Sequence, residues 1–145
     1  MTVCVPPEEL VGYGTLLQYK NPLNEVWTTV AGTKDLEFPN DTTDDIETTD
    51  NSSGGYRTYL PNPLSELESM TAEMKFLWSQ FSVLRQMKAT KVVAEWRLVL
   101  MNEVQTYMSF CAFISEISGS IPFEDLVMGS ITLRPSGGPE WGTLN

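Results

Sequence analysis

The stretch from Lys91 to Gly137 reads KVVAEWRLVLMNEVQTYMSFCAFISEISGSIPFEDLVMGSITLRPSG, and it decides the fold class. Three runs of apolar residues follow one another in it, separated by Asn102-Glu103 and by the segment 119–125. Short alternating runs divided by turn residues are typical of an antiparallel β-meander. The stretch therefore predicts a mainly β protein.

Alternation along these runs divides their side chains between two faces of the sheet. The residues expected in the core are Trp96, Leu98, Phe110 and Ile131. The opposite faces are mixed, because Glu95 and Arg97 alternate with valines there. A sheet that is partly apolar on both faces needs cover on both. The chain's own core can cover one face, and we expect a second copy or a partner on the other.

Length and composition limit the function. The chain has 145 residues, which predicts a single domain, and its net charge of -10 argues against a module that grips nucleic acid through Lys and Arg. The N-terminus does not have the pattern of a signal peptide, and the apolar runs are too short to span a membrane as helices. Cys4 and Cys111 are expected to be free thiols in a reducing compartment.

The residue types needed for common chemistry are missing. The sequence contains no histidine, which removes the commonest general base and most zinc sites. The acidic residues between Asp41 and Asp50 lack the ligand spacing of a calcium loop. No phosphate-binding glycine loop and no nucleophile elbow occurs. We therefore expect no enzyme, no metal and no cofactor.

The N-terminal third predicts an arm followed by strands. Residues 1–12 contain Pro6-Pro7 and Glu8-Glu9 and predict an extended, solvated N-terminal arm. Strands are expected at 15–19 and 25–31, the second with a possible continuation over 34–38.

Residues 39–55 form a long acidic loop in this interpretation. The segment PNDTTDDIETTDNSSGG has five acidic residues and no basic one. Its composition favours a loosely held segment. It is either a solvated surface loop or an assembly arm that becomes ordered when a neighbour binds. The β-compatible centre favours the second reading and makes these residues candidates for contact between subunits: Asp44, Asp45, Ile46, Glu47, Thr48 and Thr49.

Two patterns compete between Ser65 and Lys88. Apolar residues there fit a helical stripe, with Ser65 and Glu68 as a capping box, but residues 70–78 also alternate strictly like a strand. Before this region, 56–60 predicts a short strand that Pro61 ends. After the meander, residues 135–145 predict a Gly- and Pro-rich C-terminal tail with one aromatic residue, Trp141.

The order of several segments resembles one family. These segments are Gly12-Tyr13-Gly14-Thr15-Leu16, WTTVAGTKDL at 27–36, the acidic loop, the strand–helix–strand length of 69–100, and ITLRPSGGP at 131–139. Together they resemble the major tail tube proteins of long, non-contractile-tailed bacteriophages such as phage lambda. Met101-Asn102-Glu103 departs from the family's common Pro-Asn-Gly turn, which leaves the type of that hairpin open.

The resemblance implies an α+β fold, a β-sandwich or partial barrel with one flanking helix. It favours a strand at about 69–76 and a helix at about 79–88. It implies a virion protein whose copies form six-membered rings that stack into the tail tube, the conduit for genome delivery. The implied partners are other copies of the chain and the tail tip, tape measure and terminator proteins. Double-stranded DNA would pass without tight binding, in a particle assembled in the host cytoplasm.

Candidates for residues that line such a tube come from the polar strand faces: Thr71, Glu73, Lys75, Glu95, Arg97, Ser130, Thr132 and Arg134. The same faces could point outward instead. The alternative function is a small-ligand carrier with a closed β-barrel, which would need an apolar cavity inside one subunit.

Overall fold

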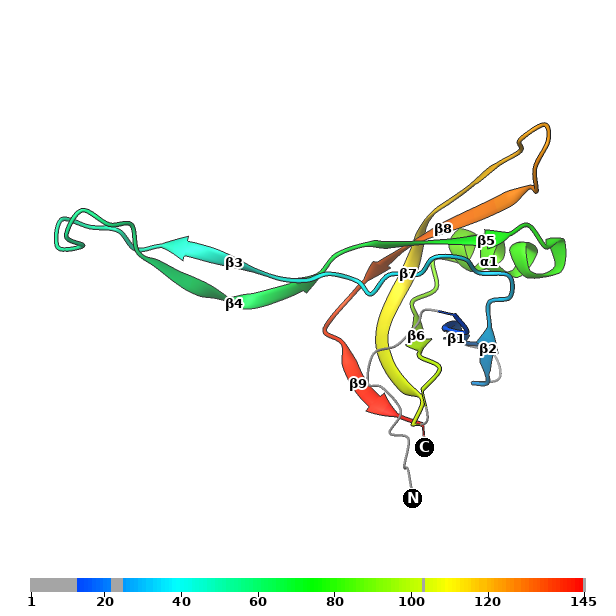
Figure 1. Cartoon of the computed structure of the whole chain (residues 1–145), viewed down its shortest axis with the longest axis horizontal. Helices are drawn as coiled ribbons and strands as arrows, with labels where there is room; N and C mark the ends of the chain where they lie inside the picture. Colours follow the sequence, from blue (N-terminus) through cyan, green and yellow to red (C-terminus); the bar gives the residue numbers. More distant parts are fainter. Residues whose placement is uncertain (1–12, 22–24, 103, 145) are drawn as a thin grey trace, which may run out of the picture.

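The computed structural model describes residues 13–21, 25–102 and 104–144. The expected N-terminal arm and Cys4 lie outside these ranges. The described part forms these elements (Figure 1): β1 (Leu16–Lys20), β2 (Trp27–Thr29), β3 (Asp41–Glu47), β4 (Tyr59–Leu67), β5 (Met70–Lys75), α1 (Trp78–Thr90), β6 (Ala94–Val99), β7 (Thr106–Ser120), β8 (Met128–Pro135) and β9 (Glu140–Thr143).

The main sheet is antiparallel and has the order β2-β1-β6-β7-β8-β5, and β9 pairs with the start of β7. The predicted meander is β6-β7-β8 and is confirmed. The sheet curls far enough for the bend after β2 to reach its other edge, where Thr33 forms a bridge with Met74 and the Lys34 N–H donates to the Glu73 carbonyl oxygen at 3.0 Å. The fold is thus a mainly β partial barrel with one helix, as predicted.

The core lies inside this curled sheet. The side chains of Trp96, Leu98, Phe110 and Ile131 are at most 3% exposed. They sit on the inward face because alternation places them there, and Trp96 stands in register with Tyr19 on β1 and Phe110 on β7. The interior that a barrel-type carrier would need for its ligand is filled by these side chains.

Helix α1 packs against the curled sheet. Leu84 and Met87, three residues apart, are its buried residues. Gln80 fastens the helix to the bend after β2, because its amide accepts from the Ala31 N–H at 2.7 Å and donates to the Ala31 carbonyl oxygen at 3.1 Å. The helix ends where Lys91 adopts a left-handed conformation, with φ of 56°. The strand at 69–76 and the helix at 79–88 are confirmed, and the competing single helix through Ser65 is wrong.

The predicted acidic loop, residues 39–55, contains a strand. Its residues 41–47 form β3, which pairs with β4 in a separate two-stranded sheet. The expectation that Pro61 ends a short strand is wrong, since β4 runs through Pro61 and Pro63. A two-stranded ribbon has outward-facing N–H positions where a proline removes no ladder bond. Figure 1 shows this hairpin projecting far from the barrel, and we call residues 41–67 the hairpin arm.

Two further expectations need correction. The C-terminal tail is not irregular throughout, because Glu140–Thr143 form β9, and the Trp141 ring lies 5.2 Å from that of Phe38. The segment 34–38 does not continue β2 as a strand. The chain is joined to the edge of β5 by the Thr33 bridge and by the hydrogen bond from the Lys34 N–H to the Glu73 carbonyl oxygen. The pattern at 34–38 therefore belongs to a connection and not to a strand.

Candidate assembly surfaces

The hairpin arm holds the six residues expected to contact neighbours. Asp44, Asp45, Ile46 and Glu47 lie in β3, and Thr48 and Thr49 follow it. All six are exposed. Hydroxyl side chains contact one another across the two strands, as in the 2.9 Å contact between the Thr43 and Ser65 hydroxyl oxygens. An exposed ribbon with so little packing of its own is suited to binding another surface.

Half of the chain's negative charge sits on this arm. Between residues 41 and 67 there are six acidic residues and one basic residue, Arg57, a net charge of -5 out of -10 for the whole chain. At the tip, hydrogen bonds from the Ser52 hydroxyl and backbone N–H hold the pKa of the Asp50 carboxyl below its ordinary value. The tip therefore stays ionised at neutral pH.

The base of the arm is anchored to the barrel. Leu67 at the end of β4 is 3% exposed and belongs to the core. Glu66 forms an ion pair of 2.6 Å with Arg134 on β8. Both side chains of this pair are largely exposed, so it contributes at most about 1 kcal/mol, and the burial of Leu67 is the stronger anchor.

The eight candidates for a tube lining share one face of the main sheet. Register places Thr71 opposite Thr132 and Glu73 opposite Ser130, and Arg97 and Glu95 stand opposite Ser109 and Cys111 on β7. Because paired residues point to the same side, these residues form one surface, turned away from the core. Hydroxyl contacts cross the strands, such as the 2.7 Å contact between Ser118 and Ser130.

The charges on this polar face are balanced. Its eight candidates include two acidic residues, Glu73 and Glu95, and three basic ones, Lys75, Arg97 and Arg134. Arg97 is held in place, since its Nε donates to the Gln18 Oε1 at 2.7 Å and its guanidinium lies 4.1 Å from the centre of the Trp27 ring. This face does not carry the chain's acidic excess, and it offers phosphate groups no continuous basic track.

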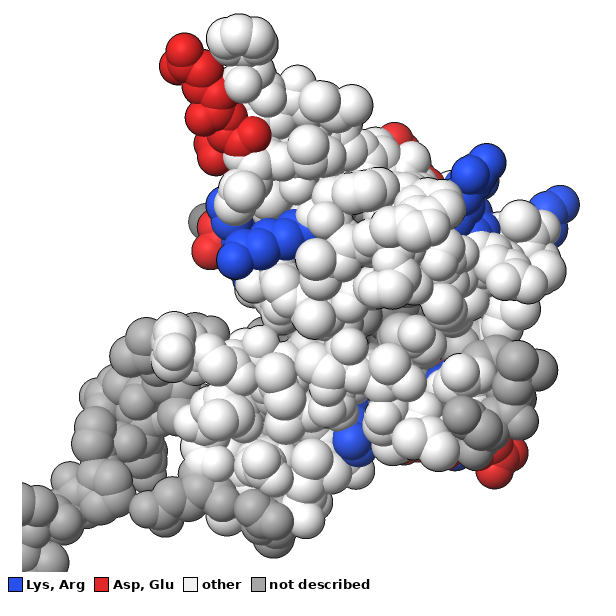
Figure 2. Space-filling model, turned by 90° about the vertical axis from the view of Figure 1, so that its right-hand side faces the viewer, with Lys and Arg blue, Asp and Glu red and all other residues white. Residues whose placement is uncertain are grey.

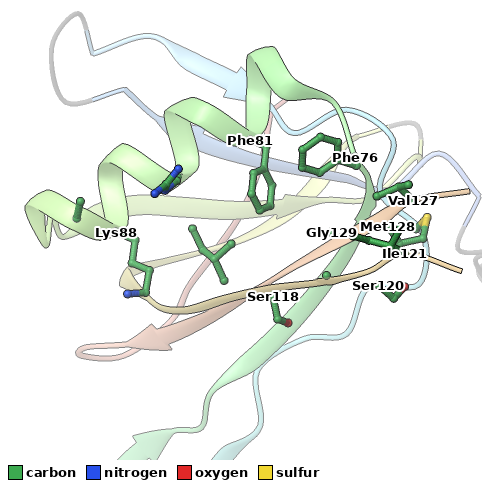
Figure 3. Close-up of a pocket in the computed structure, with 13 residues that line it drawn as sticks. Phe76, Phe81, Lys88, Ser118, Ser120, Ile121, Val127, Met128 and Gly129 are labelled. Atoms are coloured by element: carbon green, nitrogen blue, oxygen red, sulfur yellow. The ribbon is translucent and has the colours of Figure 1, made fainter.

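A groove lies between α1 and the β7–β8 hairpin (Figure 3), and its volume is about 670 Å³. Phe76 and Phe81 form one side, with ring centres 4.9 Å apart, and Ile121 and Val127 come from the hairpin. The floor is hollow because Gly119 and Gly129 face each other across the two strands. A side chain at position 129 would meet the Phe81 ring at 3.1 Å.

The rim of the groove is basic. Arg85 and Lys88 of α1 line it, and the helix has no acidic residue. In Figure 2, which faces this end of the molecule, the surface is mostly uncharged, with basic residues toward its margins and acidic ones on a protruding tip. The sequence pattern did not reveal this groove. The two glycines that make its floor are ten positions apart, and only their register shows that they meet.

The acidic and sulfur-bearing side chains do not gather into a metal site in the part of the chain that the structure describes. Within residues 13–21, 25–102 and 104–144, no group of three or more His, Cys, Asp or Glu side chains could hold a metal ion. Among the same residues, no helix has the length and apolar character needed to cross a membrane.

Comparison with known proteins identifies the fold. No protein-family model and no curated protein matches the sequence. Solved structures resemble it over nearly its whole length, among them the three that follow. A chain of the six-fold symmetrised baseplate of the anti-feeding prophage is 11% identical, with a TM-score of 0.75 over 96% of this chain and 97% of that one.

A chain of the tail of an empty gene transfer agent particle, refined with C6 symmetry, is 14% identical, with a TM-score of 0.76 over 92% of this chain and 99% of that chain. A chain of the SPP1 tail tube is 12% identical, with a TM-score of 0.68 over 93% of this chain and 80% of that chain. This chain therefore has the fold found in tail tube proteins.

Proposed function

We propose that this chain is the structural subunit of a phage-type tail tube, in which six-membered rings stack into a hollow conduit for double-stranded DNA. The observation that carries the proposal is the likeness in fold, over at least nine tenths of this chain, to chains of a tail tube, a tail and a baseplate. Two of those structures have six-fold symmetry. On this proposal the chain has no catalytic role.

The shape of the subunit supports a ring. A curled sheet with a filled core on one side and a polar, exposed face on the other can present that polar face to a channel. Edges of a sheet invite pairing with further strands, and a closed ring of subunits removes them. In the proposed tube, Thr71, Glu73, Lys75, Glu95, Arg97, Ser130, Thr132 and Arg134 face the lumen.

The balanced charge of that face fits a conduit. DNA carries one charge per about 1.7 Å of its axis and binds tightly where many Lys and Arg residues neutralise its phosphates. A wall of hydroxyl groups with acidic and basic residues side by side gives no such continuous attraction. We therefore propose that DNA passes along this face without binding tightly.

The remaining assignments follow from the same proposal. The hairpin arm, through residues 44–49, joins a subunit to its neighbours. The tail tip, tape measure and terminator proteins are the further partners. The protein is located in the tail of the virion, after assembly in the host cytoplasm.

Negative-stain electron microscopy of the purified chain tests the proposal. We expect hollow tubes with six-fold end views, either spontaneously at high concentration or after addition of a tail-initiating complex. Compact monomers at every concentration, with and without that complex, would contradict the proposal. A small molecule that co-purifies in stoichiometric amount would instead favour the carrier alternative.

A further inference from the structure

The groove between α1 and the β7–β8 hairpin is an apolar surface without cover. Phe76 is 39% exposed, Val127 is 40% exposed and Ile121 is 85% exposed. Exposed aromatic and aliphatic side chains gathered around a hollow mark a site of association. The basic residues Arg85 and Lys88 at its rim favour an occupant that is apolar in its centre and acidic around it.

The hairpin arm has this chemistry. Ile46 on β3 stands opposite Leu60 on β4, so the two side chains share a face of the ribbon, and they are 46% and 57% exposed. Asp44, Asp45 and Glu47 surround this pair along β3. The ribbon is narrow enough that charges on both of its sides lie within the screening distance of roughly 8 Å at physiological salt.

The two surfaces lie at opposite ends of the molecule. In Figure 1 the arm projects at one end of the long axis, while α1 and the β7–β8 hairpin lie at the other end. The arm of one copy cannot therefore fill its own groove in this conformation. A contact between two different surfaces of identical subunits is heterologous, and it repeats from copy to copy to give a ring or a filament.

We propose that the arm of one copy docks in the α1–hairpin groove of a second copy. The Ile46–Leu60 pair lies against Phe76 and Phe81, and the acidic residues of β3 pair with Arg85 and Lys88. Glu124 and Asp125 of this hairpin are not among the residues that line the groove. The inference deepens the proposed function, since it names the surface that receives the arm, but it requires only self-association.

A cysteine cross-link tests the contact directly. In a background with Cys4→Ser and Cys111→Ser, Ile46→Cys is combined with Ile121→Cys, a position that is exposed enough to tolerate the change. Mild oxidation should link positions 46 and 121 between copies, identified by mass spectrometry of the linked peptides. The matched control combines Ile46→Cys with Glu140→Cys on β9, which pairs with the other end of β7. That control should link much more slowly.

A charge exchange provides the second test. Arg85→Glu with Lys88→Glu should reduce the sedimenting assemblies by about tenfold or more, because acidic residues then face acidic residues. Adding Asp44→Lys and Asp45→Lys to the same chain should restore assembly. All four side chains are exposed, so the fold is expected to survive, and circular dichroism checks this.

The outcomes separate this inference from the proposed function. Tubes without a 46–121 link, or a control that links equally fast, would refute the groove contact while leaving the tube function intact. Linked multimers without tubes would support the contact and refute the tube. Monomers without any link would refute both. Failure of the charge exchange to restore assembly, with the fold intact, would also count against the contact.

Discussion

Replacement of Trp96 tests which face of the sheet forms the core. The Trp96 side chain is fully buried, and its ring centre lies 5.2 Å from that of Tyr19 at an angle of 41°. Trp96→Ala leaves a large cavity, for which losses of about 3–5 kcal/mol are typical. The ring contact is part of this loss. One contribution opposes this loss, since the indole Nε1 is buried and has no hydrogen-bond partner among the residues that the structure describes.

The buried indole N–H group affects how much unfolding free energy Trp96→Ala loses. An unsatisfied buried donor costs about 1–3 kcal/mol, and truncation removes that cost. We therefore expect Trp96→Ala to lose about 3–4 kcal/mol, toward the lower end of the range. For a chain of this length, each kcal/mol lowers Tm by about 2–4 °C, so Tm should fall by about 10 °C. Trp96→Phe keeps a ring beside Tyr19 and loses the unsatisfied N–H, and should cost less than about 1.5 kcal/mol.

Urea unfolding of the dispersed subunit, followed by far-UV circular dichroism, is the appropriate assay. It must be done below the concentration at which copies associate, because association adds to apparent stability. The m value should remain unchanged in both variants. A loss below about 1 kcal/mol for Trp96→Ala would refute the assignment of the core face. Equal losses for both variants would refute the argument from the unsatisfied N–H.

Three further outcomes are expected. In Cys4→Ser protein, a polymer-linked maleimide should label the exposed Cys111 of dispersed subunits but label assembled tubes much more slowly, because this residue shares the polar face; equal rates would place that face on the outside. Replacing residues 44–64 with Asn-Gly should leave a cooperatively folding subunit that forms no tubes, and normal tubes would contradict the role of the hairpin arm. Gly119→Ala should destabilise the subunit by about 1–3 kcal/mol, because its Cβ would lie 2.7 Å from the Met128 carbonyl oxygen, and a neutral result in thermal unfolding would mean that the β7–β8 hairpin relaxes easily.

The sequence predicted those elements whose burial follows a simple period. Strands β5, β6 and β8 and the first part of β7 largely alternate between more buried and more exposed residues, and this pattern appears in the order of the amino acids. The boundary between β5 and α1 was ambiguous by periodicity alone, since both templates fit 70–78. The resemblance in length to a known family resolved it.

The pairing of β3 with β4 in the hairpin arm was not predicted, because these two strands have almost no buried face. Without burial there is no apolar period, and the two prolines of β4 and the acidic residues of β3 together favour a loop. Strand β9 was missed for a related reason, since a short strand after Gly137-Gly138-Pro139 has too few residues to show alternation. The groove was missed because its floor is formed by two glycines, Gly119 and Gly129, which leave no apolar pattern in the sequence.

The continuity of the arm with the barrel has a mechanical consequence. Only Glu68 and Ser69 separate β4 from β5, so tension on the arm passes along one strand of polypeptide into the edge of the main sheet (Figure 1). Strand β5 is held to β8 through six paired positions, from Met70 to Lys75. Ladder hydrogen bonds run across the strands, so a pull along β5 loads all of them together in shear rather than one after another. A filament linked through such arms would resist stretching at the joints between its subunits, while the thin ribbons themselves could still bend.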